Sequence, residues 1–369
     1  MTASRALRVV HVNTERGWRG GERQALWLAQ GLQARGHVSV VAARPGEPLI
    51  ARARDAGVEV VSCAPRFEAD PVAAARLRAR IRATDADIVH AHTAHAAGLA
   101  ALATIGLRTR LVIARRVDFR LKSNAGTRWK YGRADAVIAV SNAVADVVRA
   151  GGVDAAKVFV ISDATDVRRA VAPATAETLG ELGVRADAPL VAQVAQLVGH
   201  KDPVTFVRAI GVVRERVPDV QALMVGDGPL RAEVEAEITR LGLAGVVHLA
   251  GYRTDADALL ARADVATLSS REEGMGSVLL DASLFGLPIA ATDAGGIPEV
   301  VVHGETGLVV PRERPEALGG AIARLLLDRA LAQQLGDGAR ARVADFSIER
   351  MVERTEGIYR QLLGRRAES

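Results

Sequence analysis

The stretch from Ser269 to Val301 reads SSREEGMGSVLLDASLFGLPIAATDAGGIPEVV, and it decides the fold. It follows a short apolar run, Val265 to Leu268, that suits the end of a buried strand. Two carboxylates and a Gly274-Met275-Gly276 turn come next, and apolar residues at helical spacing then continue to Gly286. A second apolar run leads into another glycine turn. Strand, turn, helix and strand in this order predict a repeat of an α/β sheet.

The first glycine turn has the features of a phosphate site. A helix that begins after Gly276 presents backbone N–H groups and the positive end of its dipole at the turn, and such a place binds phosphate. Glu273 stands beside the turn, where a carboxylate can hold sugar hydroxyls. Asp281 follows about two helical turns later.

This stretch resembles the donor-binding motif of the retaining glycosyltransferases of family 4, which have the GT-B fold. In that family a Glu followed by Gly-aromatic-Gly contacts the donor sugar, and a second Glu holds the ribose hydroxyls. The resemblance implies the first role for Glu273 and the second for Asp281, which is one methylene shorter than Glu. It also implies donor contacts from the turn and the start of the helix, at Gly274, Met275, Gly276, Ser277 and Val278.

Three further turns resemble donor-binding turns of the family. The loop Gly20-Gly21-Glu22-Arg23 resembles one whose backbone approaches the donor phosphate. Lys201 matches a lysine that grips the pyrophosphate, but Gln196 stands where the family has its arginine. Gln donates a hydrogen bond without charge, so Arg271 or an arginine of the acceptor side is a candidate for the missing cation. The turn Gly251-Tyr252-Arg253 resembles the family's base-binding turn, which implies donor contacts from Tyr252 and Arg253.

Histidines in the first half are open to two interpretations. His90, His92 and His95 invite a metal site, but no carboxylate or cysteine stands at ligand spacing, and we expect no metal. The family commonly has His-x-His here, near the acceptor pocket, and this implies an acceptor-side role for His92.

Arginines end the next predicted strand. Many family members have a His at that point, near the reaction centre, and this chain has Arg115 and Arg116 instead. Arginine grips phosphate or carboxylate groups in a bidentate way, so we expect one of the two to contact the acceptor. A basic run with interleaved aromatics continues to Arg133 and predicts an acceptor loop.

Length and repeats predict two domains. A chain of 369 residues exceeds the usual single domain. Alternating strands and helices in both halves predict Rossmann-like folding. The resemblance implies a GT-B fold with two domains facing across a cleft. We expect an acceptor domain over 1–167, a nucleotide-sugar domain over 168–345, and a final helix over 346–369 that packs back on the first domain.

Charge and composition bear on partners and location. Residues 1–165 carry 25 Lys+Arg and 14 Asp+Glu, net +11, whereas the remainder carries 23 and 29, net −6. The basic half suits an anionic membrane surface or an anionic acceptor, and aromatics at 3% argue against nucleic acid. Cys63 is the single cysteine, and no apolar signal core precedes Leu7. We therefore expect a cytoplasmic protein, peripheral on the inner face of the membrane at most.

These patterns together predict a glycosyltransferase. The expected reaction moves a sugar from a nucleotide-diphosphate-sugar, with UDP or GDP as the nucleotide, to a glycan, lipid-linked or other cell-envelope acceptor. Glu273 and Lys201 are the expected catalytic residues, and no cofactor or metal is expected. Retention of configuration is implied by the family. Two alternatives remain: a nucleotide-sugar 2-epimerase of the same fold, and an inactive homologue that binds the nucleotide-sugar.

Overall fold

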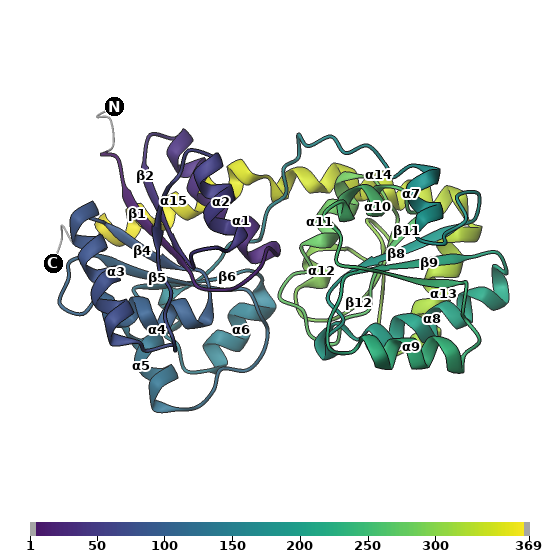
Figure 1. Cartoon of the computed structure of the whole chain (residues 1–369), viewed down its shortest axis with the longest axis horizontal. Helices are drawn as coiled ribbons and strands as arrows, with labels where there is room; N and C mark the ends of the chain where they lie inside the picture. Colours follow the sequence, from purple (N-terminus) through teal and green to yellow (C-terminus); the bar gives the residue numbers. More distant parts are fainter. Residues whose placement is uncertain (1–4, 365–369) are drawn as a thin grey trace. The chain divides into compact units, whose positions relative to one another are not determined.

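The computed structural model describes residues 5–364, which form two compact units (Figure 1). The first unit runs to Ala164 and takes in the chain from Ile348 onward, and the second is Thr165–Ser347. Sequence patterns placed the two junctions at residues 168 and 346. Each unit is an α/β sandwich with helices on both faces of a parallel sheet.

The first sheet has the strand order β3-β2-β1-β4-β5-β6-β7, all parallel, within the described residues. Its strands are β1 Arg8–Asn13, β2 Val38–Ala43, β3 Glu59–Ser62, β4 Ile88–Ala91, β5 Arg110–Arg115, β6 Ala136–Ala139 and β7 Val158–Val160. Its helices are α1 Gly20–Ala34, α2 Pro48–Asp55, α3 Pro71–Thr84, α4 Ala94–Ala103, α5 Ala125–Arg133, α6 Asn142–Ala150 and α15 Ile348–Gly364. Successive strands are added toward one edge of the sheet from β1 to β3 and toward the other edge from β4 to β7. The topological switch point of the sheet therefore lies between β1 and β4.

The second sheet repeats the plan with the order β10-β9-β8-β11-β12-β13. Its strands are β8 Leu190–Val194, β9 Gln221–Val225, β10 Val247–Gly251, β11 Val265–Leu268, β12 Ile289–Thr292 and β13 Leu308–Val310. Its helices are α7 Ala176–Glu181, α8 Pro203–Arg216, α9 Arg231–Arg240, α10 Ala256–Ala261, α11 Val278–Leu284, α12 Ile297–Val300, α13 Pro315–Leu327 and α14 Arg329–Arg342. Here the switch point lies between β8 and β11.

The last helix returns to the first unit, as the resemblance implied. Figure 1 shows α15, in yellow, crossing the first sheet. Tyr359 and Val352 of α15 are buried in one apolar cluster with Leu28 and Leu32 of α1. The two helices approach closely at Gly31, where a Cβ would lie 2.3 Å from a Val352 methyl carbon. Any larger side chain there would push α15 away.

Part of the basic run between β5 and β6 differs from its predicted loop. Ala125–Arg133 forms helix α5, and the Asn124 side chain caps it by accepting a hydrogen bond from the Thr127 N–H. Only the segment before Asn124 is irregular. Asn124 is a preferred N-cap residue, and it is the local sequence signal that indicates a helix here instead of a loop.

Within residues 5–364, no helix has both the length and the apolar character needed to cross a bilayer.

Candidate donor site at the switch point of the second sheet

The two expected catalytic residues lie together where β8 and β11 end. Lys201 closes a short 3-10 turn, Gly199–Lys201, that follows β8, and Glu273 lies in the turn after β11. The Lys201 ammonium donates a hydrogen bond to Glu273 Oε2, and the Ser270 hydroxyl donates to the same oxygen at 3.1 Å. In open α/β sheets ligands bind outside the carboxyl ends of the strands at such a switch point. The structure therefore joins two separate sequence signals in one polar site.

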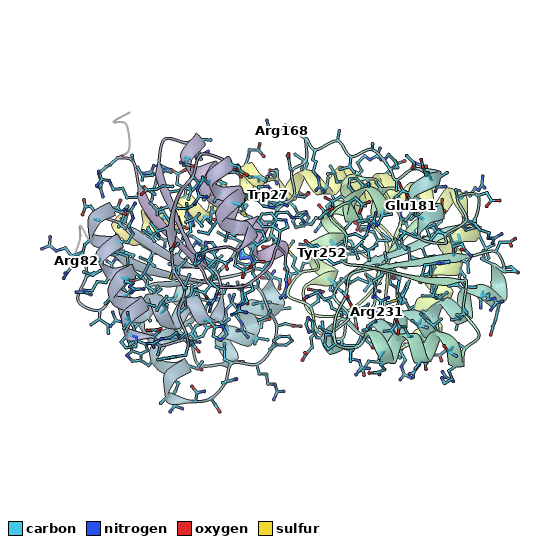
Figure 2. The ribbon with its side chains drawn as sticks, viewed as in Figure 1. Trp27, Arg82, Arg168, Glu181, Arg231 and Tyr252 are labelled. Carbon is cyan, nitrogen blue, oxygen red and sulfur yellow. The ribbon has the colours of Figure 1, made fainter. Side chains whose placement is uncertain are left out.

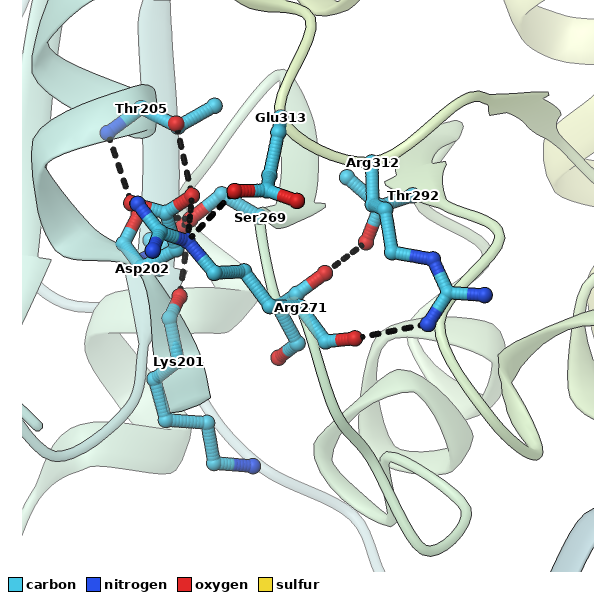
Figure 3. Close-up of polar contacts among 10 residues, drawn as sticks. Lys201, Asp202, Thr205, Ser269, Arg271, Thr292, Arg312 and Glu313 are labelled. Atoms are coloured by element: carbon cyan, nitrogen blue, oxygen red, sulfur yellow. Dashed lines mark hydrogen bonds and ion pairs between the residues drawn. The ribbon is translucent and has the colours of Figure 1, made fainter. Parts of the chain in front are cut away.

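Backbone geometry fixes the Lys201 turn. Asp202 adopts a left-handed conformation, with φ 47° and ψ 58°, and it caps α8 by accepting hydrogen bonds from Thr205 N and Thr205 Oγ1 at 3.3 and 2.7 Å. The buried Ser269 hydroxyl lies 2.8 Å from the Asp202 carbonyl oxygen and 3.1 Å from that of Lys201 (Figure 3). The end of β11 is thus tied to the turn that carries Lys201.

The glycine turn after Glu273 is packed tightly. Gly276 has φ +79°, and a Cβ there would lie 3.3 Å from side-chain carbons of Leu268 and Leu279. Met275 is buried, and the N–H of Gly296 donates to the Glu273 carbonyl oxygen at 3.0 Å. The turn leads into α11, which has seven residues and no side-chain cap on its Ser277 N-cap. A buried Met takes the place of the family's aromatic residue in this turn.

Asp281 already has strong protein partners. Its carboxylate accepts hydrogen bonds from Thr165 Oγ1 and Arg169 Nη2, both at 2.9 Å, and its side chain is 3% exposed. Arg169 also pairs with Asp257 and lies over the Phe285 ring. The expected ribose contact of Asp281 stays a prediction, and a ribose hydroxyl would have to join this cluster.

Gln196 is exposed beside a close contact between two turns. A Cβ on Gly226 would lie 2.0 Å from the Ala195 carbonyl oxygen, and one on Gly228 would lie 2.4 Å from that of Leu197. Gly226 and Gly228 are therefore needed for the turn after β9 to approach the Gln196 turn. The sequence showed these glycines, but a glycine turn by itself does not reveal which segment it approaches.

The predicted base-binding turn follows β10. Tyr252, which is labelled in Figure 2, is 65% exposed, and Arg253 pairs in a bidentate way with Asp255 at 2.8 and 2.7 Å. The Gly226 N–H donates to the Gly251 carbonyl oxygen at 2.8 Å, which joins this turn to the one after β9. An exposed aromatic ring at the carboxyl end of a strand suits stacking on a flat ligand.

Candidates in the first unit

Gly20 and Gly21 form the first turn of α1. The N-cap residue is Arg19, whose N–H donates to Glu22 Oε2 at 3.0 Å, and Glu22 Oε1 accepts from Asn13 Nδ2 at 3.2 Å. Burial raises the pKa of Glu22 against these hydrogen bonds. The start of α1, with Gly20 and Gly21, is therefore tied through Glu22 to Asn13 at the carboxyl end of β1.

Arg115 and Arg116 have different environments. Arg115 Nη2 donates to the Phe119 carbonyl oxygen at 2.5 Å. Arg116 Nε lies 3.1 Å from Asp163 Oδ1, and its side chain is 20% exposed. Both arginines line a small cavity with His90. Arg116 is held in place by a carboxylate, and Arg115 by a backbone oxygen.

The histidines that were considered together lie in two places. His95 is 63% exposed and lies 3.8 Å from Glu15 Oε1, whereas His90 and His92 are buried. His11 of β1 takes its place, because it is the parallel-strand neighbour of His90. Pairing of β1 with β4 could not be read from the sequence pattern, which is why His11 was missed.

His11, His90 and His92 form a buried polar cluster. His11 Nδ1 lies 3.1 Å from His92 Nε2, and His90 Nδ1 lies 2.6 Å from the Tyr359 hydroxyl. Burial lowers the pKa of His11 to about 3 and lowers the pKa values of the other two as well, so the rings are uncharged at neutral pH. His92 is buried, and the nearby Arg116 charge adds to the lowering of its pKa.

Comparison with known proteins

Two family models match most of the chain. The model of glycosyl transferases group 1 covers residues 175–342, and that of Glycosyltransferase Family 4 covers residues 18–169. A lipopolysaccharide core biosynthesis glycosyltransferase of Rhizobium meliloti is 32% identical over 56% of this chain and 58% of its own length. D-inositol 3-phosphate glycosyltransferase of Corynebacterium diphtheriae is 33% identical over 48% and 44%. The chain spans about half the length of the curated relatives it matches.

Solved structures share the fold over nearly the whole chain. A glycosyltransferase of Rickettsia africae has a TM-score of 0.85 at 22% identity and covers 98% of this chain and 99% of its own. Anabaena HepE in complex with UDP has a TM-score of 0.82 at 21% identity, with 96% and 100% covered. Together with the two parallel sheets, these structures show the GT-B fold, and the two family models show that the chain belongs to glycosyltransferase family 4.

Proposed function

We propose that the chain is a metal-independent, retaining glycosyltransferase that moves a sugar from a UDP- or GDP-sugar to a glycan or lipid-linked acceptor of the cell envelope. Family membership and the polar site after β8 and β11 support this function. Relatives that act in lipopolysaccharide core biosynthesis or on inositol phosphate support an envelope or phosphate-bearing acceptor. Retention follows from the family alone.

The contact between Lys201 and Glu273 is the observation that carries the proposal. Lys201 is 20% exposed and Glu273 is 11% exposed, so both are accessible from solvent and largely desolvated. A donor diphosphate offers Lys201 a second anion, and the ammonium stabilises the charge that grows on the leaving phosphate. Glu273, still held by Ser270, then accepts hydrogen bonds from the sugar hydroxyls.

Acceptor binding is assigned to the first unit. Arg116, held by Asp163, and Arg115 provide cations at the carboxyl end of β5, and His92 provides a neutral hydrogen-bonding group near them. The net charge of +11 over residues 1–165 also favours an anionic acceptor or a peripheral contact with anionic lipid.

A transfer and hydrolysis assay with UDP-, GDP- and ADP-sugars tests the proposal. Lys201→Ala should reduce turnover ~100-fold or more, because it removes a charge that acts on the leaving group. Glu273→Gln should have a comparable effect, whereas the adjacent exposed Glu272→Gln serves as its matched control. Activity of Lys201→Ala within a few-fold of wild type would refute the role of Lys201.

The same assay separates the alternatives. An epimerase would change the donor sugar without any acceptor. An inactive homologue would bind nucleotide and leave every donor intact, an outcome that Gln196 and the paired Asp281 would help to explain.

A further inference from the structure

Arg271 joins the two loops that carry Lys201 and Glu273. Its Nε and Nη2 lie 2.8 and 3.3 Å from the two carboxylate oxygens of Asp202, the residue next to Lys201 (Figure 3). Glu313 Oε1 lies 3.4 Å from the same Nε. The Asp202 side chain is 2% exposed, whereas that of Arg271 is 50% exposed. A buried acid is thus neutralised by an arginine from the neighbouring turn.

Backbone hydrogen bonds reinforce this contact. The N–H of Arg271 donates to the His200 carbonyl oxygen at 2.9 Å. Arg312 Nη1 donates to the Arg271 carbonyl oxygen at 2.9 Å. The main chain of Arg271 is therefore held by hydrogen bonds on both sides.

Arg271 does not replace the family's missing phosphate-binding cation. Its hydrogen bond to Asp202 raises the pKa of the guanidinium, which already pairs with two carboxylates, those of Asp202 and Glu313. To reach a phosphate it would have to leave Asp202 buried without a counter-charge, which is strongly unfavourable. The arrangement suits a structural contact next to the site.

Asp202 needs such a contact because its backbone is strained. It is one of three described residues other than glycine with positive φ, and an L-residue in the left-handed region costs roughly 1 kcal/mol. This conformation turns the chain directly after Lys201. The bonds to Thr205 and Arg271 hold it in place.

We propose that Asp202 and Arg271 form a clamp that positions Lys201 to exchange the Glu273 carboxylate for the donor diphosphate. This inference rests on the proposed function. It makes Arg271 a positioning residue, which acts on the diphosphate only through Lys201. The clamp keeps the Lys201 backbone still while the ammonium changes partners.

Titration calorimetry of the full chain with UDP and with GDP tests the clamp. Arg271→Met should weaken binding of the preferred nucleotide ~10-fold, within the usual range of coupling between residues of one network. Arg271→Lys keeps the charge without the fork and should fall between wild type and Arg271→Met. Arg185→Met removes an exposed arginine of the same unit that pairs with Asp219 at 3.4 Å, and it should leave binding unchanged.

A double-mutant cycle separates positioning from general damage. In a Lys201→Met background, Arg271→Met should change nucleotide affinity less than two-fold, because its effect needs the ammonium. Equal effects of Arg271→Met in both backgrounds, or no effect in wild type, would overturn the clamp. Thermal unfolding confirms that each variant is folded. Asp202→Asn can replace Arg271→Met in a second double-mutant cycle, because asparagine also adopts the left-handed backbone conformation.

The outcome for Lys201→Met alone tests the proposed function independently. If Lys201→Met leaves nucleotide affinity intact, or if neither nucleotide binds, the donor site itself is wrong and the clamp falls with it. If Lys201→Met weakens binding while Arg271→Met has no effect or an additive one, only the clamp is refuted.

Discussion

Glu356 anchors the last helix to the first unit, and its removal gives a quantitative test of that packing. Its side chain is 9% exposed, and its two oxygens lie 2.5 Å from Arg35 Nε and 2.7 Å from Arg360 Nε. His37 Nε2 is 3.2 Å away. Burial raises the pKa of Glu356, but these partners outweigh it and lower the pKa from 4.5 to about 2.

The shift sets the size of the expected effect. A pKa lowered by about 2.5, at ~1.36 kcal/mol per pKa unit, corresponds to ~3.4 kcal/mol of folding free energy. The Arg35 side chain is 47% exposed, so solvent screening reduces this value. We expect Glu356→Gln to lower the free energy of unfolding of the first unit by about 2–3 kcal/mol at pH 7.

The pH dependence has a definite sign. A carboxylate whose pKa is depressed in the folded state stabilises that state above its unfolded pKa, here near 4.5, and loses this contribution as the pH falls toward about 2. The difference between wild type and Glu356→Gln should therefore be constant above about pH 5. By pH 3.5, roughly a third to a half of it should be lost.

Tryptophan fluorescence can follow this unfolding selectively, because Trp18, Trp27 and Trp129 all belong to the first unit. Urea titrations of wild type, Glu356→Gln and the exposed control Glu353→Gln give the comparison. A Glu356→Gln variant as stable as the control, or a difference that persists unchanged at pH 3.5, would refute the reasoning.

Two further predictions concern buried groups. Burial raises the pKa of the Cys63 thiol to about 11, so in native protein at pH 8 a thiol reagent should react ~100-fold more slowly than in unfolded chain; equal rates would contradict this. Asp281→Asn should destabilise the second unit by about 2 kcal/mol, because it leaves Arg169 with only the partly exposed Asp257. Asp257→Asn is its control in thermal unfolding and should cost under about 1 kcal/mol.

Much of the fold could be predicted because its signals are local. Apolar runs such as Leu7 to Asn13 and glycine turns such as Gly274 to Gly276 mark strands and strand-to-helix turns without reference to other segments. Helix α5 was overlooked because its residues are basic and carry no apolar face strong enough to reveal it. Its Asn124 cap was the better signal.

Contacts between distant segments could not be predicted in the same way. The motif placed Glu273 and Lys201 in one site through the family resemblance, but the bond between them needs β8 beside β11. His11 joined His90 only through strand pairing. Arg169 and Asp281 form a hydrogen bond although more than a hundred residues separate them in the chain, and no periodicity in the sequence indicates such a pair.

The pairing of charges at the donor site has a consequence for how a donor would bind. Without ligand, the ammonium of Lys201 and the carboxylate of Glu273 neutralise each other, and Gln196 adds no charge. A diphosphate that takes Lys201 separates the ammonium from the largely buried Glu273 carboxylate, and breaking a buried ion pair is costly. A sugar on the diphosphate offsets that cost by donating its hydroxyls to Glu273. On the proposed function, the site therefore favours the intact nucleotide-sugar over the free nucleotide, and sugar recognition is coupled to diphosphate binding through a single ion pair.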